Sequence, residues 1–214
     1  MTRSAKGLVA VLCGMLLGSL GGITPVARAS VLTKLSLSDM TARAEHVLVG
    51  RVERIESKFA PGYDGLIITE VQIRCSRSIR GAKEGTLLTV RHIGGTVGEL
   101  GQKVFGEASY QVGEEVVLLA ELREGSLYSV GMAQGKLHID RSTGTPRVQV
   151  DLGGAELLTP TGQDLTPTAQ GVPLDTLLGQ LSELARRIPA PSEKKRLGGP
   201  ADSQSVNPPG GQKP

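Results

Sequence analysis

Residues able to do acid–base or metal chemistry are few in this sequence. It has three histidines, His46, His92 and His138, and two cysteines, Cys13 and Cys75. No His-x-x-x-His or Cys-x-x-Cys pair occurs, so the sequence carries no local metal signature and we expect no metal site. Histidines so far apart could converge only through the fold. An enzyme with dispersed residues around His92 or His138 therefore remains a third alternative.

Motifs for nucleophilic or nucleotide chemistry are incomplete. The segment 131–137 (GMAQGKL) resembles a phosphate-binding loop, but it is one residue short and has Leu137 where Ser or Thr is needed. The segment 94–101 (GGTVGELG) lacks the glycine spacing of a dinucleotide-binding turn. Cys75 follows alternating apolar residues, and we expect a buried, inert thiol. We therefore predict a non-enzymatic protein without a cofactor.

The first 29 residues carry an export pattern. A short basic region is followed by an uncharged stretch, 7–23, and by the small-x-small triplet ARA that ends at Ala29. This pattern predicts a signal peptide, residues 1–29, cleaved to leave Ser30 as the new N-terminus. A membrane anchor is the alternative, but the stretch is only about 17 residues long and contains five glycines. We expect a periplasmic or secreted protein without a membrane span after cleavage.

Cleavage changes the charge balance. The whole chain has 24 basic and 21 acidic residues, and the three bases Arg3, Lys6 and Arg28 belong to the predicted signal. The mature chain is therefore neutral, and it offers no electrostatic reason for a nucleic-acid partner. Removal of Cys13 leaves Cys75 alone, so we expect no intramolecular disulfide.

The C-terminal region divides into three parts. Residues 153–172 are predicted to be a linker. Residues 173–189 have an apolar stripe at helical spacing between two prolines, which predicts an amphipathic helix. Its members are Leu174, Leu177, Leu178, Leu181, Leu184, Ala185 and Ile188. We expect the stripe to pack on the core, with partner binding as the alternative. Residues 190–214 are rich in Pro and Gly and are predicted to be disordered.

The middle of the chain has a period of two. A short helix is predicted over 37–46, because Ser36 and Asp39 have the spacing of a capping box. Strands are predicted over 47–55, 67–75, 87–93, 115–122 and 127–132, with a further hairpin of 136–140 and 147–152. Long parallel crossovers are missing. The pattern therefore predicts a mainly β domain that spans residues 30–152. An antiparallel barrel or sandwich is favoured, and an α/β sheet is not.

Four segments carry a family resemblance: 44–52 (AEHVLVGRV), 69–74 (TEVQIR), 79–81 (IRG) and 110–119 (YQVGEEVVLL). Together they resemble the netrin-like module, the five-stranded OB-type barrel found in tissue inhibitors of metalloproteinases. The resemblance covers roughly residues 36–140. The segment 130–137 (VGMAQGKL) is similar to exported proteins of Gram-negative, myxobacteria-like bacteria. The resemblance implies an OB-type barrel with a short N-terminal helix, an extra C-terminal hairpin and the amphipathic C-terminal helix.

The chain departs from this family in one respect. Metalloproteinase inhibitors of the family bind the catalytic zinc through an N-terminal cysteine that disulfides hold in place. Here the predicted mature chain begins at Ser30 and can form no disulfide. No residue is therefore assigned from that inhibitory mechanism.

Long loops over a barrel commonly bind ligands, and the segment 94–113 is the best candidate. Its first part, 94–101, is predicted to be a flexible surface loop. The candidate interaction residues are Gly94, Gly95, Val97, Leu100, Val104, Phe105 and Tyr110. We interpret the protein as an exported non-enzymatic binding module that engages another envelope or secreted protein. The alternative is a partner or inhibitor of a secreted hydrolase such as a metalloprotease.

Overall fold

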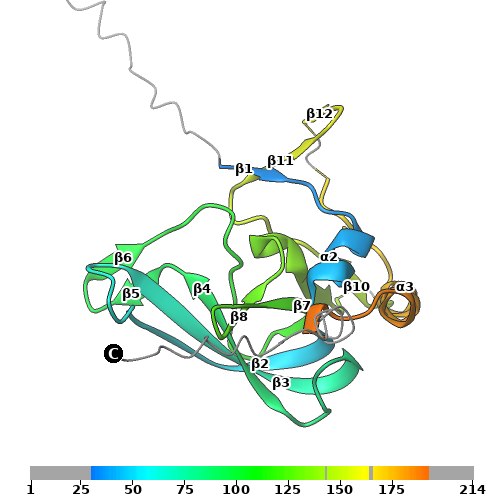
Figure 1. Ribbon diagram of the computed structural model, residues 1–214, viewed down its shortest axis with the longest axis horizontal. Helices are drawn as coiled ribbons and strands as arrows, with labels where there is room; N and C mark the ends of the chain where they lie inside the picture. The colour runs from blue at the N-terminus through cyan, green and yellow to red at the C-terminus, as the bar shows by residue number, and fades with distance from the viewer. Residues whose placement is uncertain (1–29, 143, 164–165, 193–214) are drawn as a thin grey trace, which may run out of the picture.

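The largest sheet of the protein has seven strands, in the order β10-β9-β7-β2-β3-β4-β8 (Figure 1). The computed structural model describes residues 30–142, 144–163 and 166–192. The mainly β class predicted from the sequence is confirmed. The predicted signal peptide and the predicted tail from residue 193 onward lie outside the described residues. The seven strands are β2 (His46–Phe59), β3 (Ile67–Arg80), β4 (Leu87–Ile93), β7 (Glu115–Arg123), β8 (Ser126–Ser129), β9 (Lys136–Asp140) and β10 (Arg147–Gln149).

Five of these strands are joined by a closed cycle of pairings. β2 pairs antiparallel with both β3 and β7, and β3 pairs antiparallel with β4. β8 pairs with β4 in parallel and with β7 antiparallel, so the cycle β2-β3-β4-β8-β7 returns to β2. One face of these strands gathers an apolar core. Its buried members are Leu48, Val52, Val71, Ile73, Cys75, Leu88, Val90, Val116, Leu118 and Ala120.

Strand β3 shows the predicted alternation. Residues 67, 69, 71, 73 and 75 are all buried, whereas Arg74 is exposed on the other face. Cys75 is 1% exposed, so the prediction of a buried thiol is confirmed. Both β2 and β3 run further than the sequence predicts, to Phe59 and Arg80, because their residues continue to pair across the two strands.

A second core lies between the sheet and two helices, α2 (Leu37–Arg43) and α3 (Leu174–Arg187). The helices lie beside each other in Figure 1. Leu177 and Leu181 of α3 are fully buried against residues of β2, β7 and β9. The predicted amphipathic helix is therefore confirmed, and its leucine stripe belongs to the domain's own core.

Helix α2 begins as predicted and ends earlier than predicted. The Ser36 side chain accepts from the Asp39 backbone N–H, and the Asp39 side chain accepts from the Ser36 N–H, which completes the capping box. The predicted C-terminal end at His46 is wrong. The Glu45 N–H donates to the Ala120 carbonyl at 2.8 Å, and His46 already pairs with β7. Strand pairing replaces the last helical turn.

Arg80 ties the C-terminal ends of both helices to β3. Its Nη1 donates to the carbonyls of Thr41 and Ala44, at 2.7 and 3.2 Å. Its Nη2 donates to the carbonyls of Ala185 and Ile188. One guanidinium thus satisfies carbonyls at two helix ends that have no intrahelical donor.

A second sheet contains three short strands. β1 (Val31–Thr33) pairs in parallel with β11 (Glu156–Thr159), which pairs antiparallel with β12 (Gly162–Gln163). β11 and β12 lie within residues 153–172, so a part of the predicted linker is regular structure. The sequence pattern misses these strands because each is short, and β1 and β11 pair across more than 100 residues of sequence.

Three further boundaries differ from prediction. β8 ends at Ser129, and Met132–Gly135 forms a 3₁₀ helix instead of strand. The predicted β9–β10 hairpin is confirmed, although β10 ends at Gln149. At the start of the predicted tail, Ser192 donates from its N–H and its hydroxyl to the Glu45 carboxylate, at 2.9 and 2.8 Å.

Among the described residues, no helix is long and apolar enough to span a membrane.

Candidate functional site

The segment predicted to be a flexible loop contains a β-hairpin, β5 (Gly95–Val97) and β6 (Leu100–Gln102). Polar groups at the end of β3 hold it in place. The Ile67 N–H donates to Gln102 Oε1 at 2.8 Å, and Thr69 Oγ1 donates to the Gly94 carbonyl at 2.6 Å. The prediction of a flexible loop is wrong because these long-range hydrogen bonds order the segment.

Gly95 allows the hairpin to approach the strands closely. Its φ is +129°, and a Cβ there would lie 2.3 Å from Thr69 Oγ1 and 2.4 Å from Ser57 Oγ. These two hydroxyls are themselves hydrogen-bonded at 2.8 Å. Only glycine fits at this position. The hairpin therefore lies directly against the ends of β2 and β3.

A hollow of ≈ 500 Å³, here called the first hollow, opens beside the hairpin. The side chains that matter for its chemistry are His92, Lys103, Glu107, Ser109 and Asp151. Leu100 and Phe105 adjoin its lining residues in the sequence, and they are 62% and 45% exposed. The hollow thus combines polar groups with an apolar lining, and exposed apolar side chains adjoin it.

His92 lies in the first hollow and stacks on Tyr110. The ring centroids are 5.9 Å apart, with 25° between the ring planes. Burial lowers the pKa of His92, so the imidazole is neutral at pH 7. His92 Nδ1 lies 3.3 Å from the Ile93 carbonyl. His92 is thus positioned by stacking, and its polar contact among the described residues is with its neighbour's backbone.

Tyr110 contacts the interior rather than forming a part of the surface. Its ring packs on the core of the five strands, and its hydroxyl is buried. Burial raises the pKa of Tyr110 far above its usual range, and the charges of Glu107 and Glu114 raise it further. Ser129 opposes this shift, but within the described chain neither hydroxyl makes a hydrogen bond of normal geometry. Tyr110 therefore anchors the segment instead of offering a ring to a partner.

Glu107 stands between the first hollow and a second hollow of ≈ 320 Å³. The second hollow is also lined by Arg123, Glu124 and Tyr128. Burial raises the pKa of Glu107, while the backbone of Ile93 and the charge of Arg123 act in the opposite direction. A partly desolvated carboxyl at the junction of two hollows is a natural contact point for a polar ligand.

A third hollow of ≈ 420 Å³ contains a buried ion pair. Lys136 Nζ lies 3.0 Å from Glu114 Oε2, and the two side chains are only 6% and 9% exposed. His138 Nδ1 lies 3.2 Å from the same oxygen, and the Gln111 N–H donates to Glu114 Oε1 at 3.0 Å. Lys136 Nζ also lies 5.3 Å from the centroid of the Tyr110 ring. Glu114 is thus fixed by three donors.

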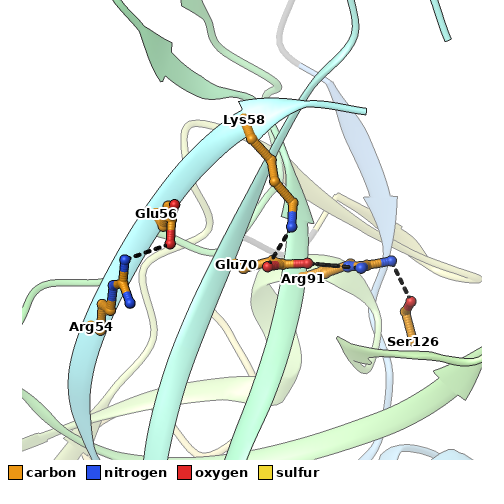
Figure 2. A network of polar contacts seen from close by, with 6 residues as sticks. All are labelled: Arg54, Glu56, Lys58, Glu70, Arg91 and Ser126. Atoms are coloured by element: carbon orange, nitrogen blue, oxygen red, sulfur yellow. Dashed lines mark hydrogen bonds and ion pairs between the residues drawn. The ribbon is translucent and has the colours of Figure 1, made fainter. Parts of the chain in front are cut away.

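A different kind of charge network lies on the outer face of β2, β3 and β4, and Figure 2 shows it. Glu70 accepts from Lys58 Nζ at 2.7 Å and from Arg91 Nη2 at 2.7 Å. Arg91 Nη1 also donates to Ser126 Oγ at 2.6 Å. The donation from Lys58, followed by that from Arg91, lowers the pKa of Glu70. These charges pair with one another across neighbouring strands.

The predicted interaction residues occupy different environments. Gly95 and Val104 line the first hollow, Leu100 and Phe105 are exposed beside it, and Tyr110 packs inside. Gly94 and Val97 belong to the hairpin region, where Gly94 is buried and Val97 is half-buried. The predicted surface is therefore brought together in part, around one depression.

Several residues of the site have no signal in the sequence. Ser109 Oγ donates to Asp151 Oδ2 at 3.2 Å from a position 42 residues away. Nothing in the sequence distinguishes Glu114 from the other acidic residues, because Lys136 reaches it only in the folded chain. Acidic and hydroxyl residues of this kind are too common for spacing alone to select them.

The histidines do not meet. His92 lies in the first hollow and His138 in the third, while His46 is at the start of β2. Within the ranges that the structure describes, no three His, Cys, Asp or Glu side chains are grouped to hold a metal ion.

Comparison of the chain with protein families, curated proteins and solved structures gives no match. The geometry of the three hollows is therefore the basis for a functional proposal.

Proposed function

We propose that the protein is an exported, non-enzymatic binding module that engages another envelope or secreted protein through the first hollow and its rim. The observation that carries the proposal is the combination of a ≈ 500 Å³ depression with the exposed side chains of Leu100 and Phe105. Apolar side chains exposed beside a depression of mixed polar and apolar lining are typical of a surface that another protein covers. The Lys103 ammonium lies 5.2 Å from the Phe105 ring centroid and adds a charged edge.

The fold assigned to this module is an OB-type, netrin-like barrel. The closed cycle β2-β3-β4-β8-β7 supports it, since a sheet whose two ends pair has no free edges. The parallel pairing of β4 with β8 and the antiparallel pairing of the other neighbours also fit this topology. The hairpin β5–β6 and the segment that follows it then lie at one end of the barrel, where such folds place their binding loops.

Export follows from the predicted signal peptide. Cleavage after Ala29 is compatible with the described contacts, in which the Ser30 carbonyl accepts from the Glu156 N–H and β1 begins at Val31. A chain that starts at Ser30 keeps every one of these contacts. Intact mass measurement of the protein from the exported fraction tests this, and a full-length mass in the membrane fraction would contradict it.

Binding is favoured over catalysis by the contacts of the candidate nucleophiles. Ser109 donates to a carboxylate and Cys75 is buried in the core. In the described ranges, neither residue is hydrogen-bonded to a histidine that could activate it. The two histidines of the hollows instead contact a backbone carbonyl and a carboxylate.

Site-specific photo-crosslinking tests the proposed function. A photoreactive residue replaces Leu100 at the rim, and the matched control replaces Leu87, an exposed leucine at the opposite end of β4 from His92. We expect one dominant adduct in the exported fraction from position 100 and none from position 87. Equal labelling from both positions, or no adduct from either, would refute the proposal. If the adduct is a hydrolase whose activity falls in the complex, the protein is its inhibitor.

A further inference from the structure

The three hollows adjoin one another and share residues of their walls. The first hollow shares Ile93 and Glu107 with the second, and it shares Ser109 and Asp151 with the third. Two of these shared residues, Glu107 and Ser109, belong to the segment 107–111. We call the three joined hollows the groove, and segment 107–111 runs along it. A groove of this form suits an elongated ligand better than a compact one.

Segment 107–111 has the side-chain alternation of a β-strand. Glu107, Ser109 and Gln111 line the groove, whereas Ala108 is 2% exposed and Tyr110 packs on the core. This period of two is that of extended backbone. The side chains that a ligand meets therefore come from every second residue.

The backbone of this segment has no strand partner. Within the described part of the chain, the N–H and C=O groups of Ala108, Ser109 and Tyr110 make no hydrogen bond to another backbone group. Unpaired N–H and C=O groups on a strand-like segment can accept an additional strand. An extended peptide binds proteins in this way, with its backbone supplying affinity and its alternate side chains supplying specificity.

The charges in the groove favour a basic ligand. Lys136 is paired with Glu114 at 3.0 Å, and Arg123 lies 3.5 Å from Glu121. Among the described residues, Glu107, Asp151 and Glu124 make no ion pair within 4 Å, and neither does Lys103, a cation that lines the first hollow. The unpaired groups of the groove therefore carry more negative than positive charge. Burial raises the pKa of Glu107, so an incoming cation would stabilise a carboxylate that is partly desolvated.

We infer that the partner contributes an extended basic polypeptide segment, which lies in the groove, pairs with the backbone of residues 108–110 and places a Lys or Arg side chain at Glu107. The inference rests on the proposed function and names the kind of partner for the same site. Side chains of the bound segment alternate between the groove and solvent, since the added strand has the same period of two.

Peptides selected on the full chain test this inference. A phage-displayed library of random peptides is panned against the protein, and the best binder is labelled as a fluorescent probe. We expect a Lys or Arg in every selected consensus. N-methylation of single amides along the probe should weaken binding at alternate positions only, by roughly tenfold or more, because only every second N–H faces the paired segment.

Protein variants provide the second arm. Glu107→Gln should weaken probe binding roughly tenfold, and replacing the probe's basic residue with norleucine should make wild type and Glu107→Gln equal. Glu56→Gln, on the outer face of β2, is the matched control and should leave the affinity unchanged. The N-methyl scan leaves the protein unaltered, so it still decides the matter if Glu107→Gln does not fold.

The outcomes separate the two proposals. A uniform N-methyl scan, a consensus without basic residues, or a library that yields no binder overturns the inference. If Leu100 still crosslinks to one protein in that case, the proposed function stands and only the extended-segment inference fails. If position 100 gives no adduct, the proposed function itself fails.

Discussion

Glu70 and Glu114 each hold two basic groups, and the two sites differ in their access to water. Glu70 lies on the outer face of β3 with Lys58 and Arg91, where the three side chains are 21%, 43% and 36% exposed (Figure 2). Glu114 and Lys136 are 9% and 6% exposed at the end of the groove. Water screens the first cluster, so its net contribution is small. The second cluster is desolvated, and each of its charges depends on the other.

The comparison shows that contact distance alone does not rank these interactions. The Lys58–Glu70 contact is 2.7 Å and the Lys136–Glu114 contact is 3.0 Å, yet we expect the loss of the longer contact to destabilise the fold more. Burial sets the free energy that is lost when one partner is removed. It also explains why Glu114 can hold the third hollow in shape while Glu70 only aligns neighbouring strands.

The largest effect is expected from Glu114→Gln. The change leaves the Lys136 ammonium buried without its carboxylate, which should lower the free energy of unfolding by about 3–5 kcal/mol. Urea unfolding at pH 7.5 measures it. Glu115→Gln is the matched control, because Glu115 is 30% exposed and pairs with Arg51 and Arg141. A loss below that of the control would show that the buried pair is not the stronger one.

Removing both charges should cost less than removing one. In Glu114→Gln with Lys136→Met, no uncompensated charge remains buried. We expect the double variant to be more stable than Glu114→Gln alone, with a coupling energy of about 0.5–3 kcal/mol. The same urea unfolding series gives the double-mutant cycle. Strictly additive losses would contradict a direct interaction between the two side chains.

A smaller effect is expected from Glu70→Gln. The exposed cluster should contribute about 0.2–1 kcal/mol at low salt. At 1 M salt, where the Debye length is about 3 Å, the difference from wild type should nearly vanish. The Glu114→Gln difference should persist at the same salt concentration. If both differences fell alike, the two clusters would be equally screened.

The smallest effect is the pH dependence of the Glu70 contribution. Lys58 and Arg91 lower the folded-state pKa of Glu70 below its unfolded value of about 4.3. A depressed carboxyl pKa stabilises the fold above the unfolded pKa, and this stabilisation is lost as pH falls through the folded pKa. The difference between wild type and Glu70→Gln should therefore be constant from pH 7 to about pH 5 and shrink below pH 4. Thermal melts of the two proteins across this range measure it, and a difference that grows on acidification would reverse the assigned sign.

Local patterns allowed much of the fold to be predicted. The capping box at Ser36, the alternation that buries Cys75 and the leucine stripe around Leu181 each depend on residues two to four positions apart. At this range the backbone geometry of helix and strand determines which side chains share a face. The sequence by itself therefore determined the mainly β class, the two helices and the buried sides of β3 and α3.

Only the tertiary structure determined the site. The β5–β6 hairpin is ordered by Ile67 and Thr69 of another strand, and β1 finds its partner in β11. The groove exists because Asp151 is brought to Glu107 and Ser109 from a distant segment. Such contacts join residues that are far apart in the sequence, so no periodic pattern reveals them. They stabilise the fold only once both segments have folded. The sequence located the segment around Phe105, but the pairing of Glu114 with Lys136 and the unpaired backbone of 108–110 were decided by packing.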